Sequence, residues 1–449
     1  MMSFFDPSGG KERHRQLQLL AWTAAICVPL LVGTLLWAYH IDTIEWKGAD
    51  FAYPQRITFW SWVSYCTQQG APFLSGYAEA KGSFLPVEEV FTDDMGFSVL
   101  VNWMTCITGR ALGRNDFFNI VLALNVILLW LFLGSFKQRP LAMLLASLLL
   151  ISPPFWISKK VIGPDLFCLY GTLSLTCVTV AILVIHGQSR WTWIGTGILA
   201  GGIYFLRQAL GMIIIFTLLL HLLFWLRNPA HRSRQQWQRW FCVAAGFLIV
   251  WAGFHAALRW RDYQIGLKPG ESHASKHHTI FHPLYVGIGN IKNNPWGIVY
   301  DDKFAFDMVL GEQTTEKRWV QSTWYLDEIR ERYLSLWKND GWRLFQCYLS
   351  HFFFVVKTTL GYVPFLLGFG YAIFISVFSS PSSHPQSILE TCIMAFAAAL
   401  LAFLIQSTLV DYQLLFSYPT ALLGRFLVAF AAADALRRFL HRQRPAGAP

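Results

Sequence analysis

Acidic residues, the side chains best suited to proton transfer and metal binding, are concentrated in two hydrophilic segments of this chain. Of the 26 Asp and Glu residues, 9 lie in residues 40–117 and 11 lie in residues 259–345. A carboxylate can take a proton from an attacking hydroxyl group, or it can hold a divalent cation that neutralises a leaving group. We therefore expect the acid–base or metal chemistry of this protein to lie in these two segments.

The first acidic segment holds two features suited to catalysis. Asp50 stands in the stretch Trp46-Lys-Gly-Ala-Asp50, and Asp93 and Asp94 form an adjacent pair in Phe91-Thr-Asp-Asp-Met-Gly96. Acids just ahead of a helix can also serve only as N-caps, which satisfy free backbone N–H groups. We predict that Asp50, Asp93 and Asp94 are catalytic, with the choice of general base between them left open. Whether the site holds Mg²⁺ or Mn²⁺ is left open as well.

Histidines gather in the second acidic segment. Two pairs are four residues apart, His273 with His277 and His278 with His282, a spacing that on a helix could form a zinc face. Nearby proline and glycine residues disfavour a regular helix, and no Cys or carboxylate completes a ligand set. We therefore expect His278 and His282 to line a polar cleft and bind substrate together with Asp302. The alternative for Asp302 is a turn and N-cap role.

Basic residues lie at the ends of apolar stretches on the same side as the acids. They are Lys159, Lys160, Arg207, Lys357 and Arg425. Long basic side chains can simply extend to lipid headgroups. They also form charge-assisted hydrogen bonds with phosphate. We predict that these five residues bind a lipid phosphate at the membrane boundary, with Arg207 and Arg425 as the principal contacts.

The elements that must position these residues are long apolar stretches. Hydrophobic residues make up 54% of the 449 residues and charged residues only 14%, well below the roughly 25% of an average soluble domain. A helix needs about 20 apolar residues to cross a bilayer. We predict an all-α, multi-pass membrane protein with a single membrane domain, residues 1–449, and about ten transmembrane helices. The expected spans are residues 17–39, 118–136, 140–157, 165–186, 192–206, 208–226, 240–258, 358–378, 388–409 and 414–436.

Two details of these spans follow from their length and flanks. Residues 191–226 would extend roughly 54 Å as one helix, so we expect a helical hairpin that turns at Arg207. The first apolar stretch has no small-residue cleavage site, so we expect it to be retained as a span. Cys66 and Cys106 share the first acidic segment and could pair in an oxidising compartment.

The short loops between spans indicate the orientation. Their basic residues alternate onto the side of the basic N-terminus, which the positive-inside rule makes cytoplasmic. Both termini are then cytoplasmic, and residues 40–117 and 259–345 are the first and second outer (periplasmic) loops. Aromatic residues in 56–67 and 319–337 predict one amphipathic helix on the membrane surface in each loop.

This layout resembles the GT-C superfamily of membrane glycosyltransferases, which use polyprenyl-phosphate sugars. The stretch ending at Asp50 is similar to the setting of the family's catalytic acid, and Asp94-Met-Gly-Phe through Gly109-Arg-Ala-Leu-Gly113 looks like its second surface helix. Further similar segments are Ser152-Pro-Pro-Phe through Gly163-Pro-Asp165, Tyr418-Pro through Arg425, and His282-Pro-Leu-Tyr-Val-Gly-Ile-Gly289 through Asp302. The family's usual Asp-Glu pair is absent at Asp50-Phe51.

The resemblance implies an inverting glycosyltransferase of a bacterial inner membrane, with a periplasmic active site and a role in cell-envelope glycan biosynthesis. The donor would be a polyprenyl-phosphate-linked sugar, and the acceptor a hydroxyl group of a glycan, lipid or protein. Membrane lipids would surround the chain, and no nucleic acid is expected as a partner. Two other classes stay open: a transporter or flippase of lipid-linked sugars, and a non-catalytic membrane scaffold. A transporter would favour ionisable groups near the midplane and repeated halves.

The orientation makes a testable prediction about both outer loops. Cysteines introduced into residues 40–117 and 259–345 should react with a membrane-impermeant maleimide added to intact cells. Cysteines introduced after Arg437 should react only after the membrane is opened. Labelling of the tail from outside would invert the orientation, and the lipid-phosphate prediction would then be wrong.

Overall fold

The computed structural model shows a chain that is helical over most of its length. It describes residues 7–42, 54–78, 83–87, 95–137, 139–151, 167–206, 211, 213–219, 222, 234–268, 281–310, 323–378, 388–410 and 414–442.

The described elements in chain order are α1 (Pro7–Asp42), α2 (Pro54–Gln68), β1 (Ser75–Ala78), β2 (Ser83–Pro86), α3 (Met95–Thr108), α4 (Arg114–Gly134), α5 (Pro140–Leu150), α7 (Phe167–His186), α8 (Arg190–Leu206), α10 (Arg234–Gln264), α11 (Phe281–Gly287), η4 (Ile288–Asn290), α12 (Asp302–Leu310), α13 (Thr323–Thr359), α14 (Tyr362–Phe378), α15 (Ile388–Leu409) and α16 (Leu414–Arg442). The strands β1 and β2 pair antiparallel, with Gly76 opposite Leu85.

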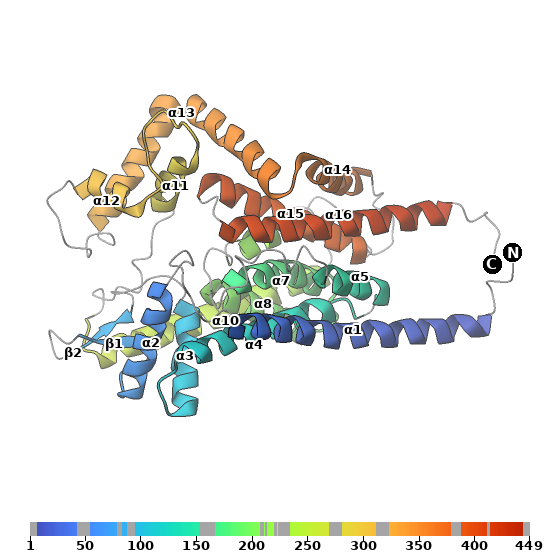
Figure 1. Ribbon diagram of the computed structural model, residues 1–449, viewed down its shortest axis with the longest axis horizontal. Helices are drawn as coiled ribbons and strands as arrows, with labels where there is room; N and C mark the ends of the chain where they lie inside the picture. Colours follow the sequence, from blue (N-terminus) through green and yellow to red (C-terminus); the bar gives the residue numbers. More distant parts are fainter. Residues whose placement is uncertain are drawn as a thin grey trace.

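The elements of both acidic segments lie at one end of the long helices (Figure 1). α2, α3 and the β1–β2 hairpin come from the first segment, and α11, α12 and the start of α13 come from the second. The first turn of α1 and the last turn of α16 lie at the opposite end (Figure 1). We call these two ends the loop end and the terminal end. Two segments far apart in sequence are therefore brought to the same end of the fold.

Five described helices are long and apolar enough to cross a membrane. They are His14–Leu35, Asn115–Gly134, Trp237–Gln264, Leu389–Leu409 and Pro419–Phe439. α13 and α14 together form a sixth candidate, bent by 103° at their junction. The protein is thus a helical, multi-pass membrane protein with five or six candidate spans among its described residues.

Some of the other expected spans are shorter here or fall outside the described residues. α5 has 11 residues, which extend only about 17 Å, and the rest of the expected 140–157 span lies outside the description. Most of the expected 208–226 span does so as well. Tyr204 and Gly211 are nevertheless in contact, whereas a straight helix would separate them by roughly 10 Å. α8 therefore does not run straight through to Gly211.

Close backbone packing joins α8 to α10. A β carbon at Gly197 would overlap the carbonyl oxygen of Val243, and one at Gly246 would overlap the carbonyl oxygen of Ile194. Small residues let the backbones of membrane helices approach closely, and this proximity supplies the dispersion contacts that hold them together. The contact determines where the loop end of α10 lies.

The main hydrophobic core lies around α4, α7, α15 and α16. Phe132, Phe396 and Phe426 come from three of these helices, and their ring centroids lie 5.3 to 6.5 Å apart. Edge and offset contacts of this kind stabilise aromatic clusters beyond simple area burial. The cluster ties the C-terminal pair of helices to the N-terminal half of the chain.

A network of charged residues joins three helices at the terminal end. Asp434 of α16 is fully buried, and its carboxylate accepts hydrogen bonds from Arg437, Arg438 and the Tyr371 hydroxyl. Arg438 also lies 2.6 Å from Glu390 of α15. Asp434 and Arg438 therefore hold α14, α15 and α16 together.

Both expected surface helices bury several of their aromatic residues in protein, because each has other elements to pack against, although Trp337 of α13 is exposed. Trp60 of α2 is fully buried against Phe97 of α3, with ring centroids 4.1 Å apart. Tyr325 and Ile329 of α13 are fully buried in a second hydrophobic cluster with α11 and α12. In α2, Tyr65 remains exposed. The aromatic residues that predicted a membrane-surface helix in each loop therefore also reflect packing inside the loops.

The α8–α10 contact can be tested with two glycines that are two residues apart. Gly195→Ala and Gly197→Ala add the same methyl group and gain the same helix propensity, roughly 1 kcal/mol. Nothing lies within 4 Å of a β carbon at Gly195, so this variant should be neutral or slightly stabilised. The overlap at Gly197 should cost about 1–3 kcal/mol. Thermal unfolding of the purified proteins in detergent measures the difference, and equal midpoints would contradict this packing.

Candidate functional site

Residues 40–117, which we continue to call the first outer loop after their expected side of the membrane, are held together by buried polar contacts between α2 and α3. Ser64 and Thr105 are joined by a hydrogen bond of 2.6 Å between their hydroxyl groups, and the Ser64 hydroxyl accepts from the Leu112 N–H at 2.7 Å. Thr67 donates to the Asn102 side-chain oxygen at 2.8 Å. Removing one partner of a buried hydrogen bond leaves an unsatisfied group, so these contacts fix α3 on α2. α3 begins directly after the Asp93-Asp94 pair.

The first turn of α3 in turn packs on the last turn of α8. Gly96 lies so close to the backbone of Phe205 and Leu206 that a β carbon there would overlap it. This close contact joins the first outer loop to the described loop end of α8. The residues in contact are sequence neighbours of two predicted site residues. Asp94 lies two residues before Gly96, and Arg207 directly follows Leu206.

Arg261, near the loop end of α10, is fully buried and holds the β1–β2 hairpin. Its Nε and Nη2 donate to Oδ1 of Asp262 at 3.0 and 2.7 Å, and its Nη1 donates to the Leu74 carbonyl oxygen at 2.8 Å. The same carbonyl accepts from the Val87 N–H at 3.2 Å. Leu74 has a φ of 51°, a left-handed conformation that leucine rarely adopts. The guanidinium therefore ties α10 to the start of the hairpin, at a carbonyl that also accepts from the residue after β2.

Asp262 has one carboxylate oxygen that this pairing does not use. Oδ2 is buried and has no hydrogen-bond partner among the residues that the structure describes. A buried charged oxygen is stabilised only by partners, so Arg261 carries most of the compensation for this carboxylate.

Lys357 and Arg425 lie close to one helix contact. Leu360, three residues after Lys357 in α13, packs against Gly424 of α16, and Arg425 is the next residue. Both basic side chains are exposed. Two of the five predicted phosphate-binding cations are thus brought to the same region from helices distant in sequence.

His282 forms the polar centre of the second outer loop. Its ring is buried and stacks on Phe306, with Nδ1 2.7 Å from the Tyr325 hydroxyl and Nε2 3.1 Å from Oδ1 of Asp302. A carboxylate only accepts hydrogen bonds, so Nε2 carries a proton and donates to Asp302. Both ring nitrogens are engaged by protein groups. In this arrangement His282 orients Asp302, whose carboxylate is 72% exposed and open to a ligand.

The second outer loop is fixed to the membrane helices through α11. A β carbon at Gly287 would overlap the carbonyl oxygen of Leu409, and Asn290 donates to the Val410 carbonyl oxygen at 3.2 Å. The loop's own cluster of buried residues thus rests on the end of α15. This contact holds the part of the loop that bears His282 and Asp302 against the end of α15.

Several predicted site residues lie outside the described residues, namely Asp50, Asp93, Asp94, Lys159, Lys160, Arg207 and His278. Within the described part of the chain, no three His, Cys, Asp or Glu side chains converge on a metal position. Cys66 and Cys106 are not joined in a disulfide here, and Cys66 is buried while Cys106 is exposed.

Sequence reasoning missed Arg261, Asp262 and the role of Tyr325. Arg261 and Asp262 follow the exposed Arg259 and Trp260 in a charged stretch, so composition gives no sign that they are buried. An adjacent Arg-Asp pair at the end of an apolar helix was the available signal. Tyr325 was expected to face a membrane surface, whereas its hydroxyl contacts His282.

No protein-family model, curated protein or solved structure matches this chain. The fold and the arrangement of the loops therefore define only its class: a helical, multi-pass membrane protein whose two polar loops lie at one end of the helices.

The buried ion pair predicts a large difference between two neighbouring arginines. Arg261→Ala should destabilise the protein by about 3–5 kcal/mol, because it leaves the Asp262 carboxylate buried without its partner. Arg259→Ala, two residues away and exposed, should change stability by less than about 0.5 kcal/mol. Thermal unfolding and limited proteolysis of the first outer loop measure both effects.

A double variant separates charge from packing at this position. Arg261→Met with Asp262→Leu removes both charges, so it should recover much of the stability lost in Arg261→Ala. If Arg261→Ala unfolds at the same temperature as Arg259→Ala, the ion pair does not hold the hairpin.

Proposed function

We propose that the protein is an inverting, GT-C-type membrane glycosyltransferase that moves a sugar from a polyprenyl-phosphate donor to an acceptor hydroxyl group. The active site would lie between the first outer loop and the loop ends of the membrane helices. The observation that carries the proposal is the contact of α3 with α8, which joins a segment that bears acids to one that bears a cation.

That contact limits how far apart the two charged segments can be. Gly96 lies against Phe205 and Leu206, and consecutive Cα atoms are only about 3.8 Å apart. Asp93, Asp94 and Arg207 are each within three residues of this contact along the chain. A base for the acceptor and a cation for the lipid phosphate would therefore be available in one region.

The exposed cations on α13 and α16 would extend the phosphate site. Lys357 and Arg425 flank the contact of Leu360 with Gly424, and Lys159 and Lys160 would join them. Charge-assisted hydrogen bonds of this kind to phosphate oxygens are short and roughly twice as strong as neutral ones. The polyprenyl tail would lie among the apolar surfaces of the spans.

The reaction needs one proton acceptor and one group that stabilises the leaving phosphate. A carboxylate, Asp50 or one of Asp93 and Asp94, would take the proton of the acceptor hydroxyl. The hydroxyl oxygen would attack the anomeric carbon at the same time. The bond from that carbon to the phosphate oxygen breaks, and the lipid phosphate leaves as an anion held by the cations. Attack from the face opposite the phosphate inverts the anomeric carbon. Electrostatic stabilisation of the leaving group would be the largest contribution to rate.

The distribution of buried charge favours this reading over a transporter. Among the described residues, Arg261 and Asp262 are buried at the loop end of α10, and Asp434 is buried near the terminal end of α16. A transporter commonly places such groups near the midplane. The proposal includes about ten spans, cytoplasmic termini, and a bacterial inner membrane with the site on its periplasmic face.

The proposal is tested by sugar transfer with purified variants in proteoliposomes. Asp50→Asn, Asp93→Asn and Asp94→Asn should lower transfer, and loss of the general base should cost about 10²–10⁴-fold in rate while donor binding persists. Arg207→Ala and Arg425→Ala should weaken donor binding by about 1.5–3 kcal/mol each. The exposed Asp327→Asn in the second outer loop serves as the matched control.

The pattern across these variants distinguishes the possible outcomes. Dead pair variants with an active Asp50→Asn would assign the base to Asp93 or Asp94. Normal transfer by all three acid variants would remove the first outer loop from catalysis. Movement of intact lipid-linked sugar across the bilayer without transfer would identify a flippase instead.

A further inference from the structure

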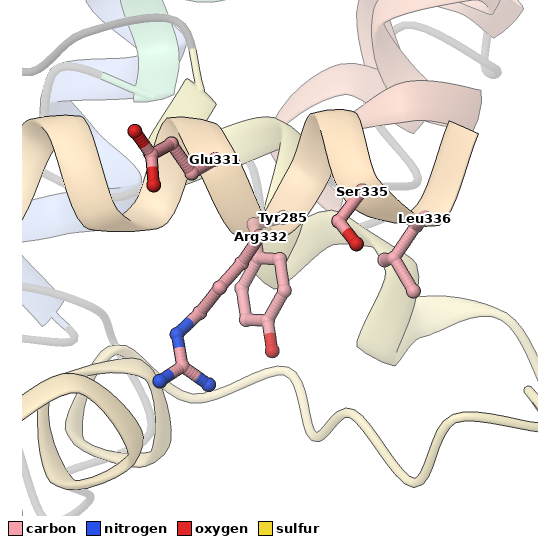
Figure 2. A pocket seen from close by; sticks show the side chains of 5 residues that line it. All are labelled: Tyr285, Glu331, Arg332, Ser335 and Leu336. Atoms are coloured by element: carbon pink, nitrogen blue, oxygen red, sulfur yellow. The ribbon is translucent and has the colours of Figure 1, made fainter. Parts of the chain in front are cut away.

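A shallow pocket of about 360 Å³ opens on the second outer loop between α11 and α13. It is lined by Tyr285, Glu331, Arg332, Ser335 and Leu336 (Figure 2). The four α13 residues fall on one helix face, and Tyr285 lies one turn after His282 in α11. The pocket therefore lies next to His282, the α11 residue that contacts Asp302. None of the pocket residues belongs to the sites described above.

Two of the lining groups are held in place by protein contacts. Nε of Arg332 donates to Glu328 at 2.9 Å, which orients the guanidinium. Figure 2 shows the guanidinium beside the Tyr285 hydroxyl. Burial raises the pKa of the Tyr285 hydroxyl, although Arg332 acts in the opposite direction. Tyr285 thus keeps its proton at neutral pH and can both donate and accept.

The lining offers both donors and acceptors of hydrogen bonds within a small space. Arg332 only donates, and the hydroxyl groups of Tyr285 and Ser335 both donate and accept, whereas the Glu331 carboxylate points away from these three groups (Figure 2). Sugar hydroxyls also donate and accept, so they fit such a mixed set. Leu336 supplies an apolar side against which the C–H face of a sugar ring can pack.

The charges around the pocket disfavour ionic ligands. Arg332 is already paired with the Glu328 carboxylate at 2.9 Å, so a phosphate or carboxylate bound to Arg332 would lie near that carboxylate, and a cation would face the guanidinium. Like charges close together are destabilising, so an ion of either sign gains little. A neutral, hydroxyl-rich group meets no such repulsion.

We propose that this pocket binds a neutral sugar unit of the acceptor, which would make it a carbohydrate subsite on the second outer loop. The acceptor role rests on the glycosyltransferase activity proposed above, whereas the binding of a neutral sugar does not. The subsite would hold the acceptor while its reacting hydroxyl extends toward the first outer loop.

Binding is tested on the full chain in lipid nanodiscs by saturation-transfer NMR. The probes are the methyl glycosides of glucose, galactose, mannose and N-acetylglucosamine, with glucuronate and inorganic phosphate as charged comparisons. At least one neutral glycoside should bind. Arg332→Ala should weaken its binding about 10-fold or more, and Tyr285→Phe and Ser335→Ala about 2–10-fold each.

The matched control is Arg330→Ala, which removes an exposed arginine from the same helix outside the pocket and should leave sugar binding unchanged. Tyr285→Phe removes only the hydroxyl group and keeps the buried ring, so this variant is expected to fold normally. Binding of glucuronate or phosphate in preference to all four glycosides, or binding of none of the probes, would overturn the proposal.

A transfer assay separates this proposal from the proposed function. If sugar binding follows the pocket variants but no transfer is found, the subsite stands and the glycosyltransferase activity fails. If transfer occurs, Ser335→Ala and Arg332→Ala should raise the acceptor KM and leave kcat nearly unchanged. Transfer with an unaltered acceptor KM would show that the pocket is not the acceptor subsite.

Discussion

Arg261, Asp262 and Asp434 are charged side chains removed almost entirely from solvent, and each has an oppositely charged partner at 2.7 Å. A charge in a low-dielectric interior is strongly destabilising unless it is paired and hydrogen-bonded. The pairs therefore restrict how the surrounding elements can move. At the loop end, Arg261 must keep both Asp262 and the Leu74 carbonyl, which fixes the first-loop hairpin on α10. At the terminal end, Asp434 fixes the last three helices to one another.

Close backbone contacts then determine which parts of the loops meet the helices. Glycines stand at these contacts because a β carbon would overlap a backbone atom of the facing helix or loop. At Gly96 the first outer loop packs against α8, and at Gly287 the second packs against the end of α15. Gly197 and Gly246 set the distance between α8 and α10. Both loops are thus joined to the membrane helices at the same end of the fold.

This arrangement gives the two loops different characters. The first is fixed by hydrogen bonds of Ser64, Thr67 and Arg261, and its candidate acids precede α2 and α3. The second has a hydrophobic cluster of its own, in which His282 contacts Tyr325 through one ring nitrogen and orients Asp302 through the other. A proton acceptor on one loop and a binding surface on the other would suit a reaction between a lipid-bound donor and an acceptor from solution.

Composition and apolar length predicted the helical membrane class, because a lipid interior demands helices of about 20 apolar residues. The uneven distribution of acids predicted which two segments carry the polar chemistry, and the basic residues of the short loops predicted that both lie on the same side. Neither signal reports what a side chain contacts. The burial of Arg261 beside Asp262 and the packing of Tyr325 on His282 depend on residues dozens of positions away.

The same limit applies to the aromatic residues of the loops. A stripe of aromatic side chains looks alike whether it meets lipid or another helix, and only the tertiary structure shows Trp60 packed against Phe97. By itself the sequence determined that the chain crosses a membrane and where its polar chemistry is concentrated, because hydrophobicity is a property of each segment alone. Which polar groups face one another was decided by the tertiary structure, because that depends on how close two backbones come.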